Sequence, residues 1–225
     1  MSRISYRGLA LIGCLSWVLS IGTSTVGHAA SGDRFNVQQV RKALGQANPQ
    51  RRVKGLQKLS ELGTAKDAAL VYPLLGDADP TVRQIALATV WQLWGKSGDP
   101  MIDRRYQEGL ALMKAGDLPQ ALEIFSDIIL KQPEFVEAWN KRATLHYLTG
   151  DYDLSMQDCE EVLKRLAQHF GALVGYAQML AERGEPERAL ALMERANKIN
   201  PYLPNAELMM SALRVQVEAN RRKLL

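Results

Sequence analysis

The stretch that decides the fold is residues 136–169, VEAWNKRATLHYLTGDYDLSMQDCEEVLKRLAQH, because its spacing of residue types recurs at an offset of 34 in both directions along the chain. The glycine near its middle, Gly150, has counterparts at Gly116 and Gly184, and an acidic residue follows each of the three. Small and apolar residues also fall in register at this offset. A fixed period of this kind predicts three copies of one structural unit over residues 102–203.

Each unit is expected to be a pair of helices joined by a tight turn. The glycine ends the first helix, because glycine adopts the left-handed backbone of such a turn at little cost. Pro133 and Pro201 fall at the ends of the first and third units, where a proline stops the second helix. Aromatic residues are only 7% of the chain, which is typical of helical rather than strand-rich proteins. We therefore predict an all-α fold.

The three units resemble the tetratricopeptide repeat, a helix pair that recurs with this same period. Trp139 matches an aromatic residue of that family, whereas Arg142 stands where the family usually has an apolar residue and Ala167 replaces a proline. The resemblance implies a right-handed α-solenoid whose concave face is lined by the first helix of each unit. It also implies a non-enzymatic scaffold that binds a protein or peptide partner on this face. Residues 204–223 form one further amphipathic stretch, which we expect to cap the solenoid.

Residues 33–96 repeat with a different and shorter offset, from Asn48 to Asp79. Asn48-Pro49 aligns with Asp79-Pro80, and Arg52 aligns with Arg83. A capping side chain followed by proline predicts a helix start at both places. This pattern resembles HEAT-like repeats, and residues 97–101 are expected to link the two arrays. An apolar helix is also expected between the two aligned segments, from residue 65 to residue 75.

The concave face of the predicted solenoid gives the candidate binding residues. Tyr106, Leu110, Met113 and Tyr147 are expected to anchor apolar side chains of a ligand, and Asn140 and Gln178 are expected to bond to its backbone. Residues that lie 34 apart occupy equivalent positions in the repeats and form a column along this face. The columns that contain the residues named above also contain Thr144 and Val174. The alternative is that these residues pack on the HEAT-like array or on the capping helix. Repeats of this family that clamp a carboxylate resemble each other in carrying lysine and asparagine on this face. Such a clamp is not expected here, because only Asn140 and the adjacent Lys141 are of that kind.

Motifs for catalysis and metal binding are missing from the sequence. Three histidines and two cysteines leave little material for a metal site, and no phosphate-binding loop, HExxH or GxSxG motif is present. We expect no enzyme activity, no cofactor and no metal. We expect Cys159 to be a small packing residue, the alternative being a thiol-active accessory factor. Arg142 is expected to form a salt bridge with Glu108 or Asp158, the alternative being a ligand contact.

A basic cluster marks the first predicted helices, and no acidic residue occurs between Arg34 and Ser60. Its members are Arg41, Lys42, Arg51, Arg52, Lys54 and Lys58. A solvated helix face explains such a cluster, and contact with an anionic envelope surface or an acidic partner is the functional alternative.

Residues 1–29 have the three parts of a secretory signal peptide. Arg3 and Arg7 are followed by an apolar run over residues 8–21, and small residues precede an expected cut after Ala29. The apolar run is shorter than the roughly 20 residues that span a bilayer. We therefore expect a periplasmic protein.

Lipidation at Cys14, which lies in a lipobox-like Leu11-Ile12-Gly13-Cys14 sequence, is the alternative to this cut. The chain carries a formal net charge of +4, and removal of Arg3 and Arg7 halves it. Binding to nucleic acid is therefore not expected.

Overall fold

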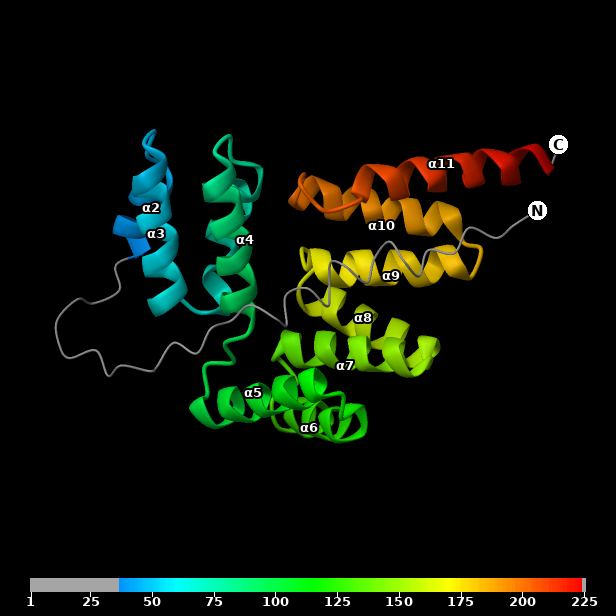
Figure 1. Cartoon of the computed structure of the whole chain (residues 1–225), viewed down its shortest axis with the longest axis horizontal. Helices are drawn as coiled ribbons and strands as arrows, with labels where there is room; N and C mark the ends of the chain where they lie inside the picture. The colour runs from blue at the N-terminus through cyan, green and yellow to red at the C-terminus, as the bar shows by residue number, and fades with distance from the viewer. Residues whose placement is uncertain (1–36, 224–225) are drawn as a thin grey trace. The chain divides into compact units, whose positions relative to one another are not determined.

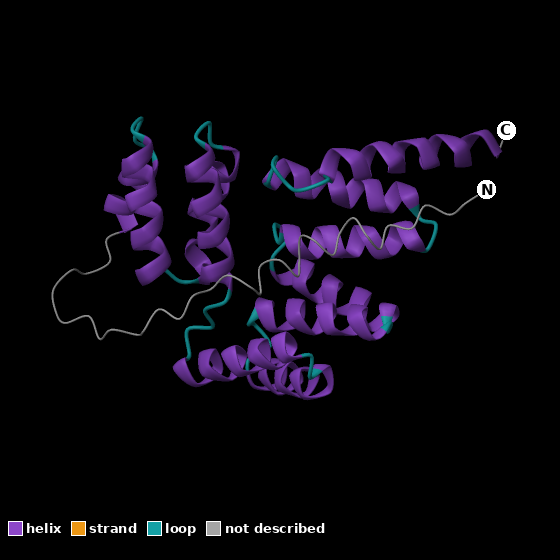
Figure 2. Ribbon diagram, viewed as in Figure 1, coloured by secondary structure: helices purple, strands orange, loops and turns teal. Residues whose placement is uncertain are grey.

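The computed structural model describes residues 37–223, and these residues form helices and no strand, which confirms the all-α prediction. The chain divides near residue 103 into two compact units. We call residues 37–103 the N-terminal unit and residues 104–223 the C-terminal unit, and describe each by itself (Figures 1 and 2). Among residues 37–223, no helix has both the length and the apolar character needed to cross a membrane.

The N-terminal unit contains α2 (Val37–Leu44), α3 (Pro49–Leu62) and α4 (Pro80–Trp94). The side chains of Asn48 and Asp79 accept hydrogen bonds from the first backbone N–H groups of α3 and α4. These caps satisfy donors that have no partner within the helix.

The two capped starts share a further contact, which recurs at the offset seen in the sequence. Arg52 donates to the backbone carbonyls of Gln46 and Ala47, and Arg83 donates in the same way to those of Asp77 and Ala78. The sequence repeat of the N-terminal unit is therefore also seen in the hydrogen bonds at the starts of α3 and α4. Its assignment to the HEAT-like class stays a prediction.

The segment between α3 and α4 differs from the helix expected over residues 65–75. It forms two 3-10 helices, η1 (Ala65–Leu70) and η2 (Tyr72–Gly76). Pro73 lies in the first turn of η2 and has no N–H group to donate to a continuing α-helix. The apolar side chains of this segment are nevertheless buried, among them those of Val71, Leu74 and Leu75. The apolar residues of the segment therefore reflect its place in the core and do not indicate an α-helix.

The C-terminal unit, together with residues 100–103, which begin its first helix, is a solenoid of helix pairs. The pairs are α5 (Pro100–Ala115) with α6 (Leu118–Lys131), α7 (Val136–Thr149) with α8 (Tyr152–Arg165), and α9 (Phe170–Glu182) with α10 (Pro186–Ile199), and α11 (Ala206–Lys223) packs on α10. The start of α5 lies inside the stretch that we expected to be a linker. Asp99 accepts from the N–H of Met101 there, and Pro100 takes the first helical position, which suits a helix start.

The repeated glycines make the turns between paired helices. Gly116, Gly150 and Gly184 have φ values of 83°, 88° and 81°, in the left-handed region that strains any residue with a Cβ. At the end of α7 the N–H of Gly150 bonds to the carbonyl of Tyr147 and that of Asp151 to the carbonyl of His146. These bonds satisfy the last carbonyls of the helix and reverse the chain into α8.

Small residues set the distance between paired helices. Ala121, Ser155 and Ala189, which occupy equivalent positions in the three repeats, are fully buried at the start of α6, α8 and α10. The hydroxyl of Ser155 donates to the carbonyl of Ala143 at 2.7 Å, so this polar side chain is satisfied inside the pair. In the first pair, a Cβ on Gly109 would lie 2.7 Å from the ring of Phe125. Only glycine permits that approach.

Candidate binding groove

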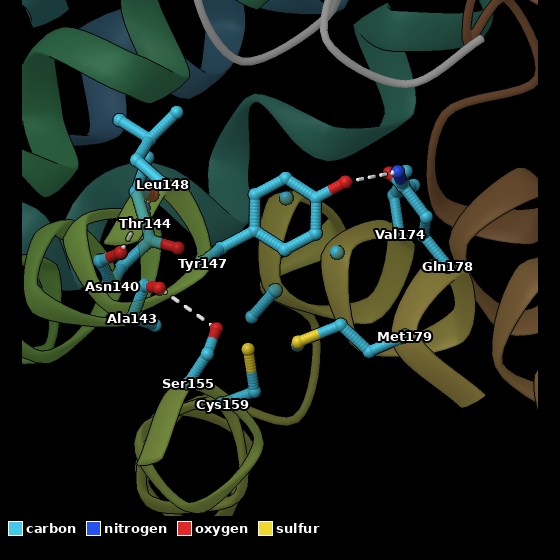
Figure 3. A pocket seen from close by; sticks show the side chains of 13 residues that line it. Asn140, Ala143, Thr144, Tyr147, Leu148, Ser155, Cys159, Val174, Gln178 and Met179 are labelled. Atoms are coloured by element: carbon cyan, nitrogen blue, oxygen red, sulfur yellow. Dashed lines mark hydrogen bonds between the residues drawn. The ribbon is translucent and has the colours of Figure 1, made fainter. Parts of the chain in front are cut away.

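A cavity of about 60 Å³ opens between α7, α8 and α9 of the C-terminal unit (Figure 3). Its wall includes five of the residues that the sequence assigned to the concave face: Asn140, Thr144, Tyr147, Val174 and Gln178. The first helix of the second repeat and the first helix of the third repeat thus both contribute predicted binding residues to the wall of one cavity. We call this hollow, with the parts of α7 and α9 that line it, the α7/α9 groove.

A hydrogen bond connects the two helices across the groove. The amide Nε2 of Gln178 donates to the hydroxyl of Tyr147 at 2.6 Å, and the tyrosine ring projects over the cavity (Figure 3). Tyr152 packs its ring 5.5 Å from that of Tyr147. These contacts hold the tyrosine in one position and leave its ring face as part of the wall.

Asn140 is held by a buried carboxylate that sequence analysis did not single out. Glu137 is 1% exposed, and it accepts from the amide of Asn140, the ammonium of Lys141 and the Nε2 atom of His169, each at 2.9 Å. Burial raises the pKa of Glu137, but Lys141 and His169 outweigh it and lower the pKa to about 2. The carboxylate is therefore ionised at neutral pH.

His169 extends this cluster from α7 to the first turn of α9. Its Nδ1 atom accepts from the N–H of Ala172 at 3.0 Å, so the hydrogen-bond pattern assigns the ring proton to Nε2, which donates to Glu137. The ring is fully buried. The Glu137–His169 pair thereby fixes the spacing of α7 and α9, and with it the width of the groove.

Tyr106, which we predicted to anchor apolar side chains of a ligand, is instead a core residue. It is 4% exposed, and its ring packs against the rings of Phe125 and Phe135 at centroid distances of 5.8 and 5.2 Å. Burial and the charge of Glu137 raise the pKa of its hydroxyl well above the ordinary value. The prediction for Tyr106 was wrong because the position of a residue in the repeat indicates on which face of the helix it lies. That position does not indicate which neighbouring side chains cover the residue.

Leu110 and Met113 are half-buried on α5 and are not among the residues that line the cavity. The anchoring roles predicted for these two side chains stay predictions. The groove described above is therefore formed by the second and third repeats.

Arg142 forms the predicted salt bridge, with Asp158 as its partner. Its Nε and Nη2 atoms donate to the two carboxylate oxygens at 2.8 and 2.7 Å. The guanidinium also lies 5.0 Å from the centre of the Trp139 ring. Glu108, the other predicted partner, pairs with Arg105 instead. Arg142 thus links α7 to α8, and it is not among the residues that line the cavity.

Cys159 is 3% exposed and packs in the core of the second and third repeats, as a small apolar residue does. Cys159 and Met179 both line the cavity, and their sulfur atoms are drawn in Figure 3 below the ring of Tyr147. This burial favours the packing role over the thiol-active alternative.

The basic cluster of the N-terminal unit loses one of its predicted members. Arg52 donates to the carboxylate of Asp77 at 2.8 Å, and its side chain is only 12% exposed. The acid comes from a later segment of the chain, so the acid-free interval from residue 34 to residue 60 did not reveal it. Lys58 is half-buried. The four other members are exposed: Arg41, Lys42, Arg51 and Lys54.

The comparison with known families concerns this same part of the chain. Residues 106–169 match the family model of the tetratricopeptide repeat. These residues carry tetratricopeptide repeats. A TPR repeat-containing protein of Rhizobium etli is 34% identical to the chain over 128 residues, which are 57% of this chain and 63% of that protein. The chain thus spans less than two thirds of the length of this relative.

Tetratricopeptide arrays use their concave surface to bind other proteins. The matched residues 106–169 therefore belong to a class of repeat that typically mediates protein–protein interaction. Within residues 37–223, no group of three or more histidine, cysteine, aspartate or glutamate side chains is placed to hold a metal ion.

Proposed function

We propose that this protein is a non-enzymatic scaffold of the bacterial cell envelope that holds a segment of a partner polypeptide in the α7/α9 groove. The observation that carries the proposal is the cavity between these helices. The resemblance to the tetratricopeptide repeat and the 34-residue spacing assigned five residues to ligand binding, and these line one hollow: Asn140, Thr144, Tyr147, Val174 and Gln178. A repeat array places such a hollow on the face where it binds partners.

The chemistry of the groove suits a polypeptide ligand. Every side chain on the cavity wall is uncharged, and most of the wall is apolar. The polar groups that it does contain, such as the hydroxyl of Tyr147 and the amide of Gln178, are of the kind that bond to a peptide backbone. Binding should therefore depend on apolar contacts and depend little on salt.

The envelope location rests on residues 1–29, which lie outside the described residues. A basic start, a short apolar run and small residues before Ala29 support export and cleavage. Lipid attachment at Cys14 remains the alternative route to the same compartment. The intact mass of protein recovered from the periplasm distinguishes them, because a chain that starts at residue 30 and a lipidated chain that starts at Cys14 differ in mass.

A second function is favoured by the exposed part of the basic cluster. Arg41, Lys42, Arg51 and Lys54 are exposed on α2 and α3 of the N-terminal unit, and they suit contact with an anionic envelope surface. Such contact weakens as salt screens the charges. Sedimentation with anionic vesicles at low salt that disappears at high salt would support this role.

Replacement of Val174 by arginine tests the main proposal. The substitution places a charge on the apolar wall of the groove, and we expect it to abolish capture of a partner from envelope extracts. Leu130→Arg is the matched control, because Leu130 is 82% exposed on α6 and does not line the cavity. Both variants should keep the helical circular dichroism of the parent. Equal capture by all three proteins would refute the proposal.

A further inference from the structure

We infer that the cavity of the α7/α9 groove is a specificity pocket for one short branched aliphatic side chain, carried by an extended and uncharged partner segment, and that Gly175 admits the backbone of that segment. This inference rests on the proposed function and specifies its ligand. It is carried by the size of the cavity, by the chemistry of its wall and by the surroundings of one glycine.

The size of the cavity limits the side chain that it accepts. Its volume is about 60 Å³. An apolar cavity of about 150 Å³ accepts benzene. The smaller space suits the branched end of valine, leucine or isoleucine and excludes an aromatic ring.

The wall of the cavity determines the polarity of the occupant. The sulfur atoms of Cys159 and Met179 line the cavity and lie below the ring of Tyr147 in the view of Figure 3, and the methyl groups of Ala143 and Ala172 also belong to the lining. The hydroxyl of Ser155 is directed to the carbonyl of Ala143. A charged side chain would be desolvated here without a partner, which is strongly unfavourable. An aliphatic side chain gains the burial of its apolar surface.

Gly175 provides the approach for a backbone. It lies in the interior of α9 and lines the cavity, and a Cβ built on it meets no atom of residues 37–223 within 4 Å. Glycine is a poor helix former, so a helix interior gains stability from alanine unless something else requires the space. Packing among the described residues does not require it, in contrast to Gly109, whose Cβ would strike Phe125. The open space above Gly175 therefore fits a ligand that lies against the helix.

The polar groups around the groove favour an extended segment over a helix. The hydroxyl of Thr144, which donates to the carbonyl of Asn140, and the amide of Gln178, which donates to the hydroxyl of Tyr147, are on the same wall as Gly175. The oxygen atoms of these groups can also accept hydrogen bonds from a ligand backbone. The backbone N–H and C=O groups of an extended segment need partners, whereas a helix satisfies its own. A strand-like segment that passes Gly175 uses both the space and these polar groups.

Selection from a library of random nine-residue peptides displayed on phage, with the full chain as target, tests the inference. We expect the selected peptides to share a central valine, leucine or isoleucine among uncharged residues. Synthetic versions with phenylalanine or aspartate at the central position should bind at least tenfold more weakly. Gly175→Ala should bind the parent peptides at least tenfold more weakly, while its melting temperature stays at or above that of the parent protein.

Ser211→Ala is the matched control, because it is also a change to alanine in a helix, at an exposed site on α11 outside the cavity. It should leave peptide binding unchanged. Peptides that bind Gly175→Ala as well as the parent, or that accept phenylalanine, overturn the inference. If such peptides still fail to bind Val174→Arg, the proposed groove stands without the pocket. Peptides that bind Val174→Arg normally, or a selection that returns none, contradict the groove and the pocket together.

Discussion

Replacing Arg142 by methionine should destabilise the C-terminal unit by about 3 kcal/mol, because it leaves a buried carboxylate without its partner. The side chain of Asp158 is only 6% exposed, and both of its oxygens receive hydrogen bonds from Arg142, at 2.7 and 2.8 Å. Methionine keeps much of the packing volume, so the change isolates the charge. Urea-induced unfolding, followed by circular dichroism, measures the loss of unfolding free energy.

The double variant Arg142→Met with Asp158→Asn provides the control. Removal of both charges should recover most of the lost stability, because replacing a whole buried ion pair is often nearly neutral. A single Arg142→Met change that leaves the unfolding free energy within about 0.5 kcal/mol of the parent would refute the reasoning, since surface substitutions fall in that range.

The loss caused by Arg142→Met should also depend on pH, because His146 lies 3.9 Å from Asp158. Burial lowers the pKa of His146, and the charge of Arg142 lowers it further. Without Arg142 we expect this pKa to rise, so that protonated His146 pairs with Asp158. A raised pKa in the folded state adds stability below it and loses that stability as the pH rises through it. The variant should therefore be less impaired at pH 5 than at pH 8.

Three further perturbations test other parts of the account. The pKa of Glu137 is about 2 in the folded protein against an ordinary value of 4.5, so stability should be complete above pH 4.5 and fall by about 3 kcal/mol as the pH drops toward 2. Acid titration of Glu137→Gln should lack much of this decrease. Gly150→Ala should cost about 1–2 kcal/mol in urea unfolding, because φ at this turn is 88°. Tyr106→Ala should cost about 3–5 kcal/mol, as truncation of a buried aromatic does, and should spare partner binding in the folded fraction.

The sequence was most informative where one short segment determines the structure. The glycines at equivalent positions of the three repeats predicted the three turns, because a positive φ is a local requirement. The caps Asn48 and Asp79 were likewise identified from neighbouring residues. Columns of equivalent residues placed Asn140 and Val174 on one face, since helices in equivalent repeats point the same way.

Contacts between distant segments were less predictable. Arg52 was assigned to an exposed basic cluster, but its partner Asp77 lies 25 residues later. Tyr106 was assigned to the groove, although Phe125 and Phe135 enclose it. In each case a tertiary neighbour from a later segment decided the exposure of the side chain.

The Glu137–His169 pair was missed for a related reason. A glutamate in the first turn of a helix usually faces solvent, and a lone histidine carries no pattern. The available signal was the spacing of Glu137, Asn140 and Lys141, which puts all three on one face of α7, with His169 at the start of the next repeat. The need to satisfy a buried carboxylate then brings the four together.

The most direct test of the central claim is photo-crosslinking from inside the α7/α9 groove to a partner. A benzoylphenylalanine residue at Leu148, which lines the cavity, should form adducts with a polypeptide, and mass spectrometry should map them to an uncharged segment with aliphatic side chains. The same probe at Leu130 on α6 should give no such adduct. Equal yields from the two positions, or adducts only from a probe at Arg51 on the N-terminal unit, would contradict the account.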